Sequence, residues 1–554
     1  MSGRSGRWWA SALLVLAGCA GDKKGAEQGV QDEELVDLER ERDQAVALLS
    51  RASLDLRGVR PSLDELQRVS DDPAALDGLL RDYASSPALG WRYAEMMSGV
   101  FLTQLSEADY GRATYPVDNE LALLQSMGEE PLRVLAAVVD EDLPYTELVT
   151  ADWTMVNEHL AAIYPSDYPE GATGWLRARY TDDRPAVGVL ATNGFYWRYD
   201  STQANANRGR ANAVSRIFTC RDYLDQVIEG NRELNLLDED AVADALRTDP
   251  ACVSCHASID PLAAYFWGFY NHFNFSPAEQ SHYHAERELD WRVYTGVGPG
   301  YYGSPGGTLA DLGRHLAADP AFIECAVQRT FEQLVARPVT LADTEALTAH
   351  REVFLSEGLR LRALVESVVR DPAYAPPADA AADPADDPRA SAPRLLSAAQ
   401  LRSSLADATG YVFEAEGLDV LAADLYGLRS LAGGLSPARD RERVVSPTST
   451  AVLAQLRLAE AAADYAVHAD LADLGRARLL PPEGLVLGPD DPAFAAHLVR
   501  LHLRLHGQRV APDGPEILAL SALFSEILRV TDEPRVAWAG MLTAMLRDPA
   551  FFIY

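Results

Sequence analysis

The sequence predicts a mainly α-helical, multidomain protein with a loop-rich central region and a duplicated helical unit in its C-terminal part. Three observations lead to this prediction. Apolar residues recur three or four positions apart over most of the chain, strand-like runs are few, and an ordered series of short motifs occurs twice. The composition, 48% hydrophobic and 24% charged, is that of a globular protein, and 554 residues leave room for roughly two to four domains.

The expected helices are segments whose apolar residues would share one helix face. The helix after Ser62 also carries a capping-box pattern, because Glu65 follows three positions later. Two short runs, 187–190 and 291–294, are the best candidates for strands. The helical segments are 33–53, 62–83, 87–105, 119–139, 310–336, 343–371, 396–408, 447–476, 491–506 and 514–529.

Shifts in composition divide the chain into seven segments. Residues 376–394 are almost wholly Ala, Asp and Pro without apolar periodicity, which predicts a linker. The other expected segments are a signal peptide (1–18), a flexible tether (19–32), an N-terminal helical domain (33–164), a loop-rich domain (165–309), a helical domain (310–375) and a C-terminal helical domain (395–554).

An internal repeat relates the two sides of the linker. A motif Asp-Pro-Ala-Phe begins at Asp319 and again at Asp491, and a motif Arg-Asp-Pro-Ala-aromatic ends at Tyr374 and again at Phe551. Asp caps a helix and Pro fits its first turn, so a common helix opening explains one such match. It does not explain the ordered series, so we infer a duplication, with His497 of the second copy in the place of Cys325.

The N-terminus has the pattern of an export signal. Arg4 and Arg7 precede an apolar run of about nine residues, which is too short for a stable membrane span. Leu16-Ala17-Gly18-Cys19 resembles the lipobox of bacterial lipoproteins, which implies lipid on Cys19. The alternative is an ordinary cleavable signal with an incidental cysteine. We therefore expect a protein of the cell envelope, anchored to a membrane by its N-terminal lipid and facing the periplasm or the cell surface.

The charge balance is strongly acidic. Eighty-two acidic against 49 basic residues give a net charge of −33, spread along the chain. Such a body repels nucleic acid and anionic membrane surfaces, so neither is an expected partner.

The most informative run is Cys252-Val253-Ser254-Cys255-His256. Two thiols three positions apart can each add to a vinyl group of haem, and the following histidine can ligate the iron. The sequence therefore predicts one covalent haem c, held by Cys252 and Cys255, with His256 as metal ligand. Three alternatives remain: a reversible dithiol, half of a zinc site, and a short-range disulfide.

Cys220 and Cys325 remain once these cysteines are assigned. In an oxidising compartment we expect them to form a disulfide. The alternative is a pair of buried thiols.

The chain resembles the multidomain, planctomycete-type cytochrome c-like proteins, whose domains are mostly of unknown function; similar lipoproteins occur in myxobacteria-like Gram-negative bacteria. After its Asp260-Pro261-Leu262, this chain has Tyr265 to Tyr270 where the family usually has an acidic or polar residue and Phe-Asp. The resemblance implies an exported redox-type protein and supplies no substrate. It is carried by residues 54–62 with 86–92, 252–262 and 322–374, and weakly by 395–410.

The sixth iron ligand decides between two functions. In an electron carrier Met or His occupies the sixth coordination position, whereas an enzyme leaves that position free for its substrate. We expect electron transfer with an unidentified redox partner or small molecule. The alternatives are a peroxidase- or oxidase-like haem enzyme and a non-catalytic lipoprotein with structural cysteines, so whether the protein is an enzyme stays open. Hydrolase motifs are absent. The candidate ligands are Met155, His159, His272, His282, His284 and His315, and His282-x-His284 is also a weak metal-site signal.

Overall fold

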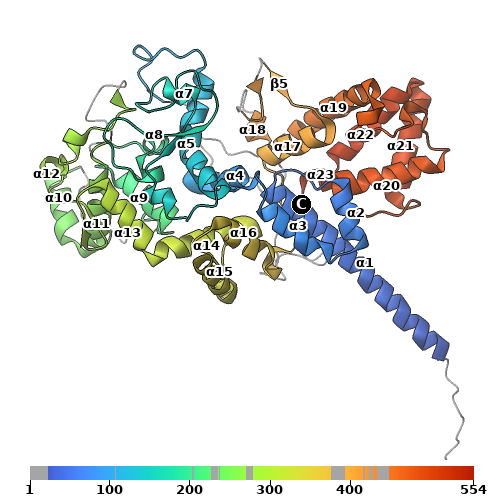
Figure 1. Cartoon of the computed structure of the whole chain (residues 1–554), viewed down its shortest axis with the longest axis horizontal. Helices are drawn as coiled ribbons and strands as arrows, with labels where there is room; N and C mark the ends of the chain where they lie inside the picture. Colours follow the sequence, from blue (N-terminus) through green and yellow to red (C-terminus); the bar gives the residue numbers. More distant parts are fainter. Residues whose placement is uncertain are drawn as a thin grey trace, which may run out of the picture.

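The computed structural model confirms a mainly helical protein (Figure 1), and the strands among its described residues form short two-stranded pairs. It describes residues 23–105, 108–202, 205–225, 235, 237–269, 279–375, 394–415, 418–422, 428–432 and 448–554. Cys19, His272 and residues 376–393 of the expected linker lie outside these ranges.

The N-terminal part is built from helices around the long α5. The capping box expected at Ser62 is present, since its hydroxyl accepts the Glu65 N–H and the Glu65 carboxylate accepts the Ser62 N–H. Antiparallel β1 and β2 pair Thr154 with Ala178. The elements are α1 Lys23–Leu56, α2 Leu63–Asp71, α3 Ala75–Ala84, α4 Leu89–Phe101, α5 Glu120–Asp140, α6 Glu147–Thr150, β1 Thr154–Val156, α7 Glu158–Ala161 and β2 Leu176–Ala178.

The central part contains more helix than its composition suggested. Helices α9 and α10 each pack against α11, which carries the cysteine motif, and none of the three was among the expected helical segments. The elements are η1 Gly188–Ala191, α8 Asn193–Arg198, α9 Arg208–Phe218, α10 Glu239–Thr248, α11 Pro250–Ala263, η2 Ala264–Phe266, η4 Ala285–Arg287, α12 Trp291–Tyr294, β3 Gly300–Tyr301 and β4 Ser304–Pro305.

The two motif copies have the same order of elements. Asp319 and Asp491 cap α14 and α20, each accepting the N–H two residues later. Two further helices follow in both copies before a last capped turn at Asp371 and Asp548. The first-copy elements are α13 Leu309–Ala318, α14 Pro320–Val335, η5 Leu341–Asp343, α15 Thr344–Ser356, α16 Leu361–Val369 and η6 Pro372–Tyr374. The C-terminal elements are α17 Ala398–Thr409, β5 Glu414–Ala415, β6 Leu418–Asp419, α18 Leu428–Leu431, α19 Ser449–Ala472, η8 Leu474–Arg476, η9 Gly484–Val486, α20 Pro492–His506, α21 Pro515–Thr531, α22 Pro534–Arg547 and α23 Pro549–Phe552.

Three expectations about local structure were wrong. Residues 187–190 are not a strand: 188–191 form the buried 3₁₀ helix η1, which starts where Gly188 adopts a φ of +54°. Residues 291–294 form the helical turn α12, whose Trp291 carbonyl accepts the Gly296 N–H. Branched and aromatic side chains favour strands, but among the described residues neither run has a strand to pair with. The tether expected at 19–32 is helical from Lys23 on, because Ala26, Glu27 and Gln28 are good helix formers.

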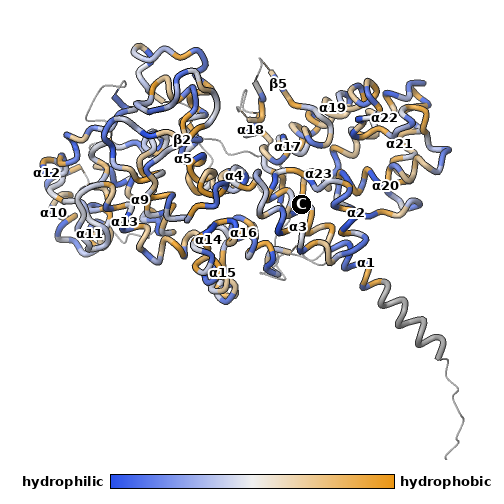
Figure 2. Tube along the Cα trace, viewed as in Figure 1, coloured by the Kyte–Doolittle hydropathy of each residue, from blue (hydrophilic) through white to orange (hydrophobic). Residues whose placement is uncertain are grey.

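Helix α1 lies between two apolar cores. Leu49 and Leu56 belong to the larger core, shared with the central part and the first copy, whereas Leu54 belongs to the core of the C-terminal half. Figure 1 accordingly shows α1 to α3 between the central part and α17 to α23. Hydrophobic and hydrophilic residues alternate along the helices, as expected for helices with one face in a core (Figure 2). Within the described residues no helix is both long and apolar enough to cross a bilayer.

Candidate haem-attachment site

The cysteine motif lies in the first half of α11. Asp249 caps this helix by accepting the Ala251 N–H, and Pro250 occupies its first turn. Cys255 and His256 lie three and four positions after Cys252, so both share a helix face with it. Both cysteines are half-buried residues and neither is disulfide-bonded. The thiols are therefore not sealed inside the core, which is a condition for adding a macrocycle to them.

A carboxylate holds the imidazole of His256. Its Nδ1 lies 3.0 Å from Asp260 Oδ1, one turn further along α11. Because an ionised carboxylate can only accept, Nδ1 carries the proton and Nε2 keeps a lone pair for a metal. Burial acts to raise the pKa of Asp260, but hydrogen bonds from His256 and Arg208 outweigh it and lower that pKa. The donor set, two accessible thiols and an oriented imidazole, fits a covalently attached haem.

Arg208, from the start of α9, completes this arrangement. Its Nε donates to Asp260 Oδ1 at 2.6 Å and its Nη2 to Oδ2 at 3.2 Å. We did not predict either residue. The spacing of four between His256 and Asp260 was a usable signal, whereas Arg208 lies 52 positions away from Asp260 and nothing in the sequence pairs them.

The disulfide expected between Cys220 and Cys325 is confirmed, with the two Cα atoms 5.3 Å apart. It joins the segment after α9 to α14. Three residues past Cys220, the Tyr223 hydroxyl lies 2.8 Å from Ser258 Oγ on α11. The disulfide thus fixes a segment that contacts the motif helix directly.

The aromatic residues after the motif are core residues. Phe266, Trp267 and Phe269 are almost fully buried. Phe269 stacks on Tyr196 with ring centroids 3.5 Å apart, and Trp267 stacks on Tyr294. Residues 270–278, which follow directly, lie outside the described part of the chain.

The candidate sixth ligands are scattered over several elements. Met155 is in β1, His159 in α7 and His315 in α13, where its ring stacks on Tyr301. In the part of the chain that the structure describes, the hydrogen-bond partner of His256 is Asp260, and none of these candidates is hydrogen-bonded to it.

The weak metal signal at His282-x-His284 finds no support. His282 Nδ1 faces Ser281 Oγ and His284 Nδ1 faces a Glu286 oxygen at 3.3 Å. Across the described ranges, three or more His, Cys, Asp or Glu side chains nowhere converge in a metal-binding group.

Residues 64–165 match the family PSD4, a protein of unknown function (DUF1592). The chain contains a DUF1592 domain. This domain belongs to the planctomycete cytochrome c-like proteins and includes residues 86–92, one of the stretches behind the resemblance; the motif at 252–256 lies outside it. No curated protein and no solved structure matches the chain.

The DUF1592 domain contributes a second polar cluster, around Glu130 of α5. This carboxylate is fully buried and accepts from Thr154 Oγ1 at 2.8 Å, Tyr164 OH at 3.1 Å and the Gly194 N–H at 3.0 Å. The Tyr180 hydroxyl is a fourth donor. Burial raises the pKa of Glu130 despite these hydrogen bonds. The cluster ties α5 to β1 and α8, and the abundance of carboxylates hid it from sequence analysis.

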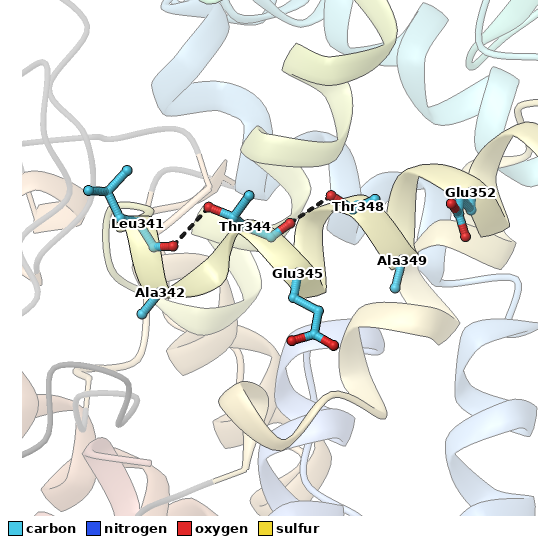
Figure 3. A pocket seen from close by; sticks show the side chains of 7 residues that line it. All are labelled: Leu341, Ala342, Thr344, Glu345, Thr348, Ala349 and Glu352. Carbon is cyan, nitrogen blue, oxygen red and sulfur yellow. Dashed lines mark hydrogen bonds between the residues drawn. The ribbon is translucent and has the colours of Figure 1, made fainter.

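A surface cavity of about 620 Å³ lies along η5 and α15 (Figure 3). In its wall, Thr344 Oγ1 donates to the Leu341 carbonyl of η5 at 2.8 Å, and Thr348 Oγ1 donates to the Thr344 carbonyl of α15 at 2.7 Å. Glu345 and Glu352 are its ionisable residues. Two carboxylates on one exposed helix form no catalytic constellation, so the candidate site stays at α11.

Proposed function

We propose that this chain is an exported, lipid-anchored c-type monohaem protein that acts in electron transfer. The observation that carries the proposal is the arrangement on α11. Two half-buried thiols share a helix face with an imidazole whose Nδ1 is held 3.0 Å from a carboxylate. The DUF1592 domain supports it, because that domain belongs to cytochrome c-like proteins.

Each residue of the motif has a distinct role in this proposal. Cys252 and Cys255 would hold haem through thioether links, and His256 Nε2 would ligate the iron. A haem bound there supplies one-electron Fe(III)/Fe(II) chemistry. Asp260 keeps the proton on Nδ1, so that the imidazole presents its lone pair on the other nitrogen. Ile259 and Leu262 anchor the helix in the core and fix the direction of the imidazole.

Two of the alternatives to haem need features beyond the motif. A zinc site needs further ligands, and no group of three or more is found within the described residues. A dithiol of the oxidoreductase type follows a strand, whereas α11 directly follows α10.

Covalent haem tests the proposal. The full chain is produced with a c-type haem attachment system and stained for haem after denaturing electrophoresis. The Cys252→Ala, Cys255→Ala variant is expected to lose the stain. The matched control is Cys220→Ser, Cys325→Ser, which also removes two cysteines and is expected to keep it. A wild-type chain without covalent haem refutes the proposal and leaves a lipoprotein with structural cysteines.

A second candidate is a haem enzyme with an open iron site. It is favoured by the carboxylate on His256, because such a partner increases the electron donation of the ligand and stabilises ferric iron. A six-coordinate, low-spin absorption spectrum supports the electron carrier. A high-spin spectrum that shifts on addition of cyanide supports the enzyme.

The location rests on the N-terminal sequence. Lipid on Cys19 would hold the acidic body at a membrane surface of the cell envelope. Incorporation of labelled fatty acid into the wild-type chain but not into Cys19→Ser is the expected result. Labelling of the variant would contradict this part of the proposal.

A further inference from the structure

Two hydrogen-bond donors, the imidazole of His256 and the guanidinium of Arg208, share one oxygen of the Asp260 carboxylate. His256 Nδ1 lies 3.0 Å from Oδ1, and Arg208 Nε lies 2.6 Å from the same atom. A hydrogen bond from a guanidinium withdraws charge from the carboxylate oxygen it contacts. Arg208 therefore makes Asp260 Oδ1 a weaker hydrogen-bond acceptor for the Nδ1 proton of His256.

The geometry of this triad is fixed by packing rather than by chance surface contact. The Asp260 side chain is 14% exposed and those of His256 and Arg208 are each 24% exposed. Helices α9 and α11 pack against each other, and Ile259 and Leu262 on either side of Asp260 are buried. The three groups are thus held in register by two helices, in surroundings where charge acts more strongly than in bulk water.

We infer that Asp260 and Arg208 are opposed positioning residues that set the electron donation of His256 to its metal. Asp260 accepts the hydrogen bond from Nδ1 and so makes Nε2 a stronger electron donor to the metal. Arg208 reduces this effect, because it withdraws charge from the carboxylate. This inference rests on the proposed function and deepens it. It has a consequence that a merely structural role does not have: removing the two residues changes the reduction potential in opposite directions.

The first test measures that potential. In haem-loaded full-length protein, Asp260→Asn is expected to raise the midpoint potential, with about a tenfold change in the Fe(III)/Fe(II) ratio at fixed potential, or about 59 mV. Arg208→Gln is expected to lower it, because Asp260 then carries its full charge. The matched control is Asp244→Asn, which removes an exposed carboxylate from α10, the helix packed beside α11.

Three outcomes of the potential measurement overturn the inference. The first is a potential unchanged in both variants. The second is a shift in the same direction in both. The third is an equal shift in the Asp244→Asn control, which would show a general effect of net charge. Opposite shifts with a silent control support it.

The second test needs no haem, so it separates this inference from the proposed function. Histidine-labelled Cys252→Ala, Cys255→Ala protein is examined by ¹⁵N NMR, with the His256 signal assigned by its loss in His256→Gln. The proton is expected on Nδ1, and on Nε2 in the additional Asp260→Ala variant. An Nε2 proton with Asp260 present overturns the inference. An Nδ1 proton in a chain that never attaches haem supports the triad while the proposed function fails.

Discussion

Tyr374 and Tyr554 donate their hydroxyls to the two oxygens of one carboxylate, that of Asp55, at 2.9 and 2.8 Å. Tyr374 ends the motif of the first copy, Tyr554 lies three residues after the end of the second, and Asp55 lies near the end of α1. Arg394 donates to the same carboxylate, and Arg51 lies close to it. Asp55, Arg51 and Arg394 are each at most 4% exposed. A buried charge cluster therefore joins the N-terminal helices to both copies.

The first prediction concerns this cluster. Asp55→Ala is expected to lower the free energy of unfolding by about 3–5 kcal/mol, because it removes the carboxylate partner of two buried guanidinium groups. Urea unfolding checks it. Glu460→Ala, which breaks an exposed ion pair with Arg457 on α19, is the control and should change the free energy by less than about 0.5 kcal/mol. Equal effects of the two substitutions would show that the cluster contributes little.

The second prediction concerns the disulfide. It closes a loop of 105 residues, which restricts the unfolded chain by about 4–5 kcal/mol in the entropy model. Cys220→Ser, Cys325→Ser should lower the melting temperature, and a reductant should move the wild type towards the value of the variant. A reductant that lowers the melting temperature of the variant as much would speak against this assignment.

The third prediction concerns acid stability. His506 is buried against the Met545 carbonyl and His502, with Asp548 and Arg60 nearby; burial is the main cause that lowers its pKa to about 4. The unfolded chain, with a histidine pKa near 6.5, then binds more protons. Stability is therefore full above pH 6.5 and falls as the pH drops towards 4, by about 2–3 kcal/mol.

Unfolding free energies of the wild type and His506→Gln between pH 7 and 4 test this prediction. In the variant, the unfolding free energy should fall less steeply with decreasing pH, because the contribution of His506 is gone. His468→Gln is a suitable control, because that side chain is 57% exposed. A slope that is identical in the wild type and in His506→Gln would contradict the prediction.

The fourth prediction concerns Glu130. All four of its partners are donors, so Glu130→Gln places an amide NH₂ against a donor in a fully buried site. We expect a loss of about 1–3 kcal/mol in unfolding free energy. Glu141→Gln, at a half-exposed carboxylate after α5, is the matched control. A loss no larger than that of the control would show that the site tolerates an amide.

Local signals in the sequence predicted local structure well. The capping box at Ser62 and the paired Asp-Pro helix openings were readable because each depends on residues within one turn. Helices α9 to α11 and α22 were missed, since their apolar faces are short or interrupted by polar residues. The two strand predictions failed because a β-branched or aromatic run says nothing about whether a pairing partner exists.

Distant pairings were mostly out of reach. The disulfide could be proposed because few cysteines remained to pair. Arg394 and Asp55 lie 339 positions apart, and arginine and aspartate are too common for such a pair to be singled out. The same holds for Arg208 at the candidate site, whose role depends on how α9 crosses α11. The motif itself was visible because cysteine and histidine are rare in this chain.

The position of α1 has a consequence for how the molecule comes apart. Leu54 and Leu56 point to opposite sides of this helix, one into each core. Gln400 and Tyr554 of the C-terminal half donate to the Leu54 carbonyl and to the Asp55 carboxylate of the same helix. Cutting the polypeptide once between Ala375 and Arg394 would thus not release either piece. The two fragments would elute together as one particle, and only a denaturant would part them.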